Sequence, residues 1–186
     1  MTRALFFTTT ALAFSLFVAS PASAQMTKAG KSFAATQSVG GETLVLNGVG
    51  VRKATFLKVK VYAAGLYLPE KSSDAKAILN ADQKWRIVMK LVRDADAESL
   101  REGFIEAFKK NGNAGLKKSI TKLNTFISDM KKGDVVTITY EPGKGTKVSH
   151  KNGGGRVKGK VLGKAMLQIW LGNPPNKSLK TGMLGG

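Results

Sequence analysis

The spacing of apolar residues changes along the chain, and this change restricts the fold more than any other feature of the sequence. From Glu42 to Val92 apolar and polar residues tend to alternate, which is typical of half-buried strands. Between Asp94 and Met130 the apolar residues recur at helical spacing in two segments, and after Gly133 the period returns to two. Lys164 to Leu171 predicts one more helix. This order predicts an α+β domain, with a large antiparallel β-sheet packed against a layer of helices.

Local signals predict where individual elements start and stop. Asn47-Gly48 interrupts the first apolar stretch and predicts a turn between two short strands. Gly65 lies inside the next strand-like stretch, from Thr55 to Leu68, and predicts a bulge or a close approach of two backbones. Asp94 and Asp96 are suitable N-caps for the first helix, and Asn111-Gly112 is a suitable end for it.

The first 24 residues have the features of a secretory signal peptide. Arg3 supplies a basic start, residues 4–19 are mostly apolar, and Ala22-Ser23-Ala24 has the small-x-small pattern that signal peptidases cut. The apolar stretch is shorter than the roughly 20 residues that a spanning helix needs, and no other segment approaches that length. We therefore expect cleavage after Ala24, a periplasmic or secreted protein, and no transmembrane segment in the mature chain.

Beyond this leader the sequence predicts a single domain. Residues 25–41 are small and polar and predict a loosely ordered lead-in, whereas residues 42–186 carry the strand and helix patterns. The absence of cysteine excludes a disulfide scaffold, a thiolate zinc site and a cysteine nucleophile. His150 ends a predicted strand beside a polar turn, so we expect a solvated imidazole and no metal site.

The charge balance is strongly basic, with 30 Lys and Arg against 12 Asp and Glu and a formal net charge of +18. The lysines are spread over helix ends and hairpins and are not interleaved with aromatic residues, which argues against a nucleic-acid surface. A basic, exported protein is instead expected to associate with anionic lipid head groups or with other polyanions of the cell envelope.

Familiar catalytic and cofactor motifs are missing from the sequence. Gly143-Lys144-Gly145-Thr146 lacks the earlier glycine of a phosphate-binding loop and predicts a turn. The carboxylates of Asp94, Asp96 and Glu98 are expected to start a helix, and no pair is spaced for acid–base work. No cofactor is therefore predicted.

Three motifs occur in an order that is more specific than any one of them. The first is Gly48-Val49-Gly50-Val51-Arg52, the second is the run from Lys58 to Leu68, and the third is Ile169-Trp170-Leu171-Gly172-Asn173-Pro174-Pro175. In the second motif Lys60, Ala63, Gly65, Tyr67 and Leu68 carry the pattern. In this order the motifs resemble the chalcone isomerase-like family, and within it the exported bacterial branch. The resemblance runs from about Glu42 to Gly185, and it also takes in Leu91-Val92-Arg93-Asp94, Lys132-Gly133-Asp134 and the stretch from Tyr140 to Thr146.

The resemblance implies an open-faced β-sandwich, in which an apolar ligand cleft lies between the sheet and the helices. In the plant enzymes of the family, the arginine at the position of Arg52 contacts the developing enolate of a chalcone. In the fatty-acid-binding relatives, the matching arginine and a tyrosine hold a carboxylate. The ligand-binding candidates implied here are Arg52, Tyr62 and Tyr67, and Tyr62 stands where the plant enzymes carry a catalytic threonine. Because Tyr62 and Tyr67 are five residues apart, they face opposite sides of a strand unless Gly65 forms a bulge.

Three functions remain open at this point. The sequence favours a non-enzymatic binding protein for a small amphipathic acid, of which a fatty acid is the leading candidate, because a guanidinium beside an apolar cavity is a good partner for a carboxylate. The second is an isomerase, or intramolecular lyase, that acts on an enone with Arg52 as its catalytic residue. The third is a structural envelope protein whose cleft is closed. The size of the cavity distinguishes the first from the third.

Overall fold

The computed structural model describes residues 25–54 and 57–186 of the chain. The predicted signal peptide over residues 1–24 and its cleavage site lie outside the described residues. Thr55 and Phe56, with which the second strand-like stretch was expected to begin, lie outside them as well.

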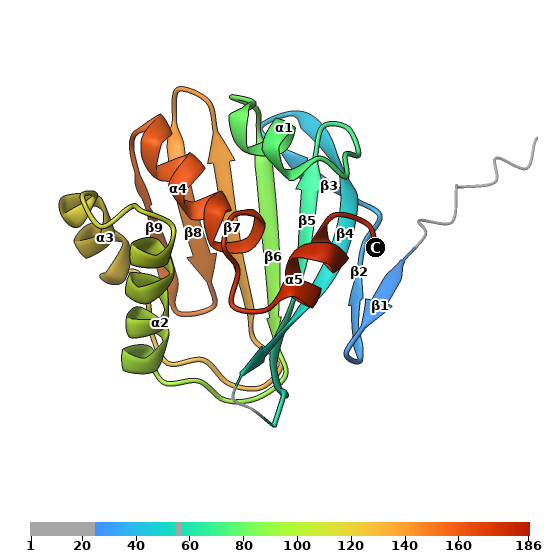
Figure 1. The fold of residues 1–186 in the computed structure, drawn as a ribbon, viewed down its shortest axis with the longest axis horizontal. Helices are drawn as coiled ribbons and strands as arrows, with labels where there is room; N and C mark the ends of the chain where they lie inside the picture. The colour runs from blue at the N-terminus through green and yellow to red at the C-terminus, as the bar shows by residue number, and fades with distance from the viewer. Residues whose placement is uncertain (1–24, 55–56) are drawn as a thin grey trace, which may run out of the picture.

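A seven-stranded antiparallel sheet dominates the described residues, and each strand pairs with its neighbours in sequence (Figure 1). The strands, in order across the sheet, are β3 (Thr36–Val39), β4 (Glu42–Ala54), β5 (Val59–Leu68), β6 (Trp85–Leu91), β7 (Val135–Glu141), β8 (Gly145–His150) and β9 (Gly153–Val157). This meander confirms the α+β class and the antiparallel sheet.

The helices gather on one face of the sheet, which we call the inner face (Figure 1). They are α1 (Ala75–Asn80), α2 (Ala97–Lys110), α3 (Lys117–Asn124), α4 (Lys160–Leu171) and α5 (Lys177–Met183). The start of α2 is as expected, because the Asp96 side chain accepts a hydrogen bond from the Ser99 backbone N–H at 2.8 Å. None of the helices in the described residues is long and apolar enough to span a membrane.

The second predicted helix ends earlier than the apolar spacing suggested. α3 stops at Asn124, whereas the pattern continued to Met130. The backbone of Met130 instead exchanges two hydrogen bonds of 2.9 Å with that of Ala95, so this segment pairs as a short bridge beside the start of α2. The short helices α1 and α5 had no counterpart in the sequence prediction.

Residues 25–41 are not a loosely ordered lead-in. They form a hairpin of β1 (Met26–Lys28) and β2 (Lys31–Phe33), followed by β3, which pairs with the start of β4. Phe33 is 1% exposed and packs on the outer face of the sheet, where a Cβ at Gly65 would lie 2.8 Å from its ring. Because Gly65 has no side chain, there is room for the aromatic ring of Phe33. A close approach at Gly65 is therefore present, but its partner is a side chain and not a second backbone.

The expected turn at Asn47-Gly48 does not form, because β4 runs through it with only a shift in register. The Asn47 amide is buried and bonds to the Ser72 carbonyl at 3.0 Å and the Met183 carbonyl at 2.8 Å. At Gly48 a Cβ would collide with the backbone of Gly182. Packing of α5 against this part of β4 therefore overrides the local turn signal.

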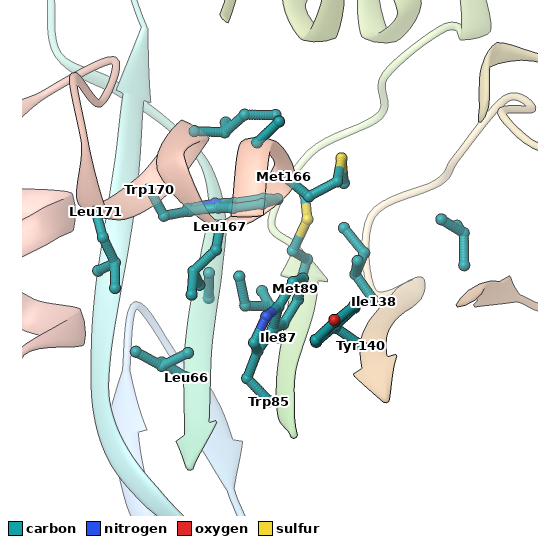
Figure 2. Close-up of a cluster of buried hydrophobic side chains, with 14 of the residues drawn as sticks. Leu66, Trp85, Ile87, Met89, Ile138, Tyr140, Met166, Leu167, Trp170 and Leu171 are labelled. Carbon is teal, nitrogen blue, oxygen red and sulfur yellow. The ribbon is translucent and has the colours of Figure 1, made fainter. Parts of the chain in front are cut away.

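The main core lies between the inner face and the helices. In Figure 2, side chains of α4 such as Met166, Leu167 and Trp170 face side chains from the central strands, including Ile87 of β6 and Ile138 of β7. Trp170 is completely buried, and Phe104 of α2 meets it edge-on with ring centroids 6.3 Å apart. This core supports one wall of the pocket described next.

Candidate ligand-binding site

The pairing of β4 with β5 brings two of the three predicted site residues together. Arg52 and Tyr62 are directly opposite each other in the register of the two strands, and both line the same pocket on the inner face. Arg52 is half-buried, and Tyr62 is 4% exposed. A guanidinium and a phenol are thereby placed side by side at the wall of a cleft.

Tyr62 is held by the main core. The indole Nε1 of Trp170 donates a hydrogen bond of 3.2 Å to the Tyr62 hydroxyl oxygen. Burial raises the pKa of Tyr62, although the positive charge of Arg52 and the bond from Trp170 act in the opposite direction. The hydroxyl is therefore protonated at neutral pH. Its oxygen accepts the bond from Trp170, and within the described residues it donates no hydrogen bond, so its proton is available to a ligand in the pocket.

Arg52 has an unsatisfied donor. Its Nε is buried and has no hydrogen-bond partner within the described residues. A buried donor without a partner costs about 1–3 kcal/mol, so such groups are uncommon in folded proteins. An acceptor brought by a ligand would remove that cost, and a carboxylate supplies the strongest acceptor for a guanidinium.

The pocket at Arg52 and Tyr62 has a volume of about 350 Å³, which lies within the range of small-molecule sites. Its lining is Arg52, Ala54, Val61, Tyr62, Met89, Arg93, Asp94, Ala95, Asp96, Ser99, Leu100, Gly103, Phe104 and Ile169. The polar residues other than Arg52 and Tyr62 come from the connection between β6 and α2 and from the first turn of α2. The deeper wall is apolar.

A second, almost entirely apolar cavity lies directly behind that wall. It has a volume of about 30 Å³ and shares Met89, Leu100 and Phe104 with the pocket. The rest of its lining is Leu91, Leu123, Phe126, Ile127, Met130, Val136, Ile138, Val148, His150 and Met166. Leu100 and Phe104 are on the core-facing side of α2 but are only half-buried, whereas Phe108 on the same side is fully buried. The partition between the two spaces is therefore less completely packed than the end of the helix.

His150 lines this cavity and is half-buried. Its Nδ1 accepts a bond of 3.2 Å from the Asn152 backbone N–H, so the ring proton lies on Nε2, which is 2.6 Å from the Phe126 carbonyl oxygen. The sequence predicted a solvated side chain, whereas the imidazole is only partly exposed and joins the β8–β9 turn to the segment after α3.

The acidic groups at the mouth of the pocket hold the backbone in place. Asp94 accepts bonds from the Lys132 backbone N–H at 2.8 Å and from Lys131 Nζ at 3.1 Å, and these contacts lower its pKa. The cap that Asp96 forms to Ser99 lowers the pKa of Asp96 in the same way. Both carboxylates are ionised at neutral pH and are poor proton donors. Asp96 caps α2 as expected, whereas the cap predicted at Asp94 is wrong, because its carboxylate bonds to Lys131 and Lys132 instead.

Tyr67 is not brought together with the other two candidates. β5 has no bulge at Gly65, so Tyr67 faces the outer side, where it packs with Phe33. Its hydroxyl donates a hydrogen bond of 3.0 Å to the Ala34 carbonyl, and burial raises its pKa to about 12. The alternation rule thus predicts the separation of the two tyrosines correctly.

The sequence did not single out three residues of this site. Trp170 positions the Tyr62 hydroxyl, Phe104 separates the pocket from the apolar cavity, and Arg93 adds an exposed cation to the lining. Trp170 and Arg93 lie in segments that carry the family resemblance. That resemblance was the only signal in the sequence that could have placed them in the site. Within the described residues, no group of three or more His, Cys, Asp or Glu side chains could hold a metal ion.

Comparison with known proteins identifies the family and agrees with the fold. A family model described as chalcone isomerase-like matches residues 25–185. Among solved structures, the fold is similar to that of a fatty-acid binding protein from Arabidopsis thaliana, with a TM-score of 0.70 and 20% identity, over 87% of this chain and 96% of that one. A search of curated proteins finds no match.

Proposed function

The chain belongs to the chalcone isomerase-like family, and from that premise we propose that it is a non-enzymatic binding protein for a small amphipathic acid. A fatty acid fits best. The carboxylate lies against Arg52 and Tyr62, and the alkyl chain passes Phe104 toward the apolar cavity. The plant relative of the same fold, which is described as a fatty-acid binding protein, supports this choice of ligand.

One observation carries the proposal: the buried Nε of Arg52 without a partner, beside a tyrosine hydroxyl whose proton is free. Together they form a site for one anion with two acceptor oxygens. The charge of Arg52 stabilises the carboxylate in a partly dehydrated pocket, and Tyr62 adds a neutral donor without a second charge.

The apolar cavity supports the orientation of the ligand. A volume of about 30 Å³ holds little more than one water-sized group, so a long alkyl chain requires the wall at Leu100 and Phe104 to move. Because that wall belongs to the half-buried side of α2, its displacement disturbs less of the core than a movement of α4 would. We therefore expect the ligand to widen the space between α2 and the sheet.

The isomerase alternative fits this pocket less well than the binding of an acid. Ring closure of a chalcone needs stabilisation of an enolate oxygen and an oriented phenolate. Arg52 could provide the first, but the Tyr62 phenol takes up space where the plant enzymes carry a threonine. The purified protein is expected to leave chalcone cyclisation at its spontaneous rate, and saturable turnover that disappears in Arg52→Ala would favour the enzyme instead.

The direct test compares a fatty acid with the fatty alcohol of the same length in titration calorimetry, after mass spectrometry has identified the acid that co-purifies. Arg52→Ala should weaken binding of the acid by roughly ten- to a hundred-fold, since a hydrogen bond to a charged group contributes about 1.5–3 kcal/mol. The alcohol should bind the wild type more weakly than the acid and lose little in the variant. Equal losses for both ligands would mean that Arg52 does not hold the carboxylate.

Periplasmic or secreted localisation is part of the same proposal and rests on Ala22-Ser23-Ala24. The mature protein is expected to begin at Gln25, and intact-mass analysis of protein from the periplasmic fraction measures this directly. Retention of residues 1–24 in that fraction would contradict it.

A further inference from the structure

The end of the β4–β5 hairpin combines an exposed apolar side chain with a cluster of lysines. Leu57 is 70% exposed, the highest exposure among the large apolar side chains of the described residues. Lys58 follows it, and Lys53 and Lys60 lie on the two strands of the hairpin. In Figure 1 this hairpin extends to the end of the molecule at which the connection from β6 to α2 also lies.

Lys53 and Lys60 are cross-strand partners in the register of β4 and β5. Like charges directly opposite each other in an antiparallel pair are unfavourable unless an anion lies between them. Lys28 of β1 joins them around a hollow of about 450 Å³. Within residues 25–54 and 57–186, no carboxylate forms a salt bridge to any of the three.

The remaining lining of this hollow suits a phosphate group. Ser178 lines it beside the three lysines, and its hydroxyl oxygen accepts a bond of 2.9 Å from the Asn176 side chain, which leaves its proton for a phosphate. Thr181 lines it as well, but its hydroxyl donates to the Lys177 carbonyl. The rest of the lining is Ala29, Val49, Val51, Gly182 and Gly186. Hydroxyl and ammonium groups are the donors that phosphate oxygens accept from, and a lysine contributes as a point charge. The hollow is more open to solvent than the pocket at Arg52.

The same hairpin also borders the proposed ligand pocket. Arg52 and Ala54 line that pocket, and its opposite rim carries Arg93, which is exposed and forms no salt bridge within the described residues. An apolar tip, unpaired cations on both sides and the mouth of an apolar pocket are thus found at one end of the molecule.

We propose that this end of the molecule is a docking surface for a bilayer that contains anionic phospholipid. Leu57 enters the interface between head groups and acyl chains, and lipid phosphates lie among Lys28, Lys53 and Lys60. The charge of the surface and the exposed leucine favour a bilayer over a soluble polyanion, which would offer Leu57 no apolar partner. That a fatty acid reaches the Arg52 pocket from this bilayer rests on the proposed function, whereas the docking itself does not.

Vesicle flotation with purified protein tests the surface. Vesicles rich in phosphatidylglycerol are expected to bind the protein at low salt and release it at high salt, and pure phosphatidylcholine vesicles are expected not to bind. Near an anionic bilayer a lysine contributes about 1 kcal/mol, or roughly five-fold in affinity. A triple variant should therefore bind these vesicles roughly a hundred-fold more weakly. It combines Lys28→Gln, Lys53→Gln and Lys60→Gln.

A matched control has the same change in net charge at another place. Lys117 and Lys118 are exposed on α3, which contacts β9, and Lys147 is exposed on β8. β8 and β9 lie at the opposite edge of the sheet from the β4–β5 hairpin, so replacement of these three lysines by Gln should cost no more than a few-fold. For the apolar tip, Leu57→Asp is compared with Val161→Asp, because Val161 is 65% exposed at the start of α4. Only Leu57→Asp is expected to weaken binding, by roughly ten-fold or more.

The outcomes separate this surface from the ligand pocket. Equal losses in the two triple variants, equal effects of Leu57→Asp and Val161→Asp, or equal binding to neutral vesicles would each overturn the docking surface. Leu57→Asp should keep the affinity for free fatty acid in solution, and Arg52→Ala should keep most of the vesicle binding. If fatty-acid binding itself proved absent while the hairpin variants lost the vesicles, the docking surface would stand and the proposed function would fail.

Discussion

The two faces of the sheet differ in how completely their aromatic and charged side chains are packed and hydrogen-bonded within the chain. On the outer face, Phe33 and Tyr67 are closely packed, and Arg86 donates to Thr139 at 2.9 Å, to Gln37 at 3.1 Å and to the Ser38 carbonyl. On the inner face, Arg52 has a buried donor without a partner, and Phe104 is half-buried beside a pocket. Around Phe33, Tyr67 and Arg86 the outer face completes its contacts within the chain, whereas the inner face at Arg52 and Phe104 is left open for a ligand.

This difference indicates which substitutions should affect folding and which should affect binding. A side chain whose contacts are all internal stabilises the fold, and its loss lowers the free energy of unfolding. A side chain with an unsatisfied group contributes little to stability, and its loss mainly lowers the affinity for the ligand. Three pairs of residues of the same type, one on each face, allow the comparison to be tested.

The phenylalanine pair should show the largest effect. Phe33→Ala removes a buried ring and should lower the free energy of unfolding by about 3–5 kcal/mol, as for other core aromatic residues. Phe104→Ala removes a half-buried ring at the pocket and should cost about 1 kcal/mol. Urea denaturation of both variants measures the difference. A loss below about 1 kcal/mol for Phe33→Ala would mean that the β1–β2 hairpin does not contribute to the core.

The arginine pair should separate stability from binding. Arg86→Ala leaves Thr139 and Gln37 without a donor and should lower the free energy of unfolding by about 1–3 kcal/mol, with little change in affinity for the acid. Arg52→Ala removes an unsatisfied donor, so stability should stay the same or rise slightly while affinity falls as described above. Thermal melts with and without the acid report both quantities, because a saturating ligand raises the melting temperature of any variant that binds it. A loss of affinity in Arg86→Ala, together with a loss of stability in Arg52→Ala, would contradict this prediction.

The sequence predicted those parts of the fold that depend on neighbouring residues. The alternation of β6, the Asp96 cap and the end of α2 at Asn111 are all determined within a few positions. The opposite orientations of Tyr62 and Tyr67 follow from their spacing alone.

Long-range packing explains the errors. Residues 25–41 looked loosely ordered because their short strands expose most of their side chains, and the burial of Phe33 depends on Gly65 in another strand. Asn47-Gly48 has the chemistry of a turn, yet Asn47 bonds to Met183, 136 positions away. Nothing local could have anticipated either contact.

The site was predictable only in part for the same reason. Arg52 and Tyr62 were named through the family resemblance, and the register of β4 and β5 brings them together. The bond from Trp170 to Tyr62 joins residues 108 positions apart, and the role of Phe104 depends on how α2 lies over the sheet. Tyr67 was grouped with them by its motif, although its hydroxyl bonds to Ala34 on the other face.

The tyrosine pair should show the smallest effect and compares the two faces at the level of a single hydroxyl. Tyr62→Phe removes a neutral donor to the carboxylate, worth about 0.5–1.5 kcal/mol, so affinity for the acid should fall by up to roughly ten-fold. It also leaves the Trp170 N–H without its acceptor, so a modest loss of stability accompanies it. Tyr67→Phe removes the bond to Ala34 and should lower the free energy of unfolding by a similar amount, with affinity unchanged.

The pH dependence of binding sharpens this last comparison. Burial raises the pKa of Tyr62 above its ordinary value of 10.0, so the hydroxyl remains a donor and the affinity of the wild type should be flat between about pH 7 and pH 9. Affinity should fall only in acid, as the ligand carboxylate takes up a proton and loses its charge-assisted contact with Arg52. Titrations of wild type and Tyr62→Phe across this range should therefore give parallel curves. A wild-type affinity that declined between pH 7 and pH 9, in step with loss of the Tyr62 proton, would show a phenol far more acidic than its burial allows and would contradict the neutral-donor role.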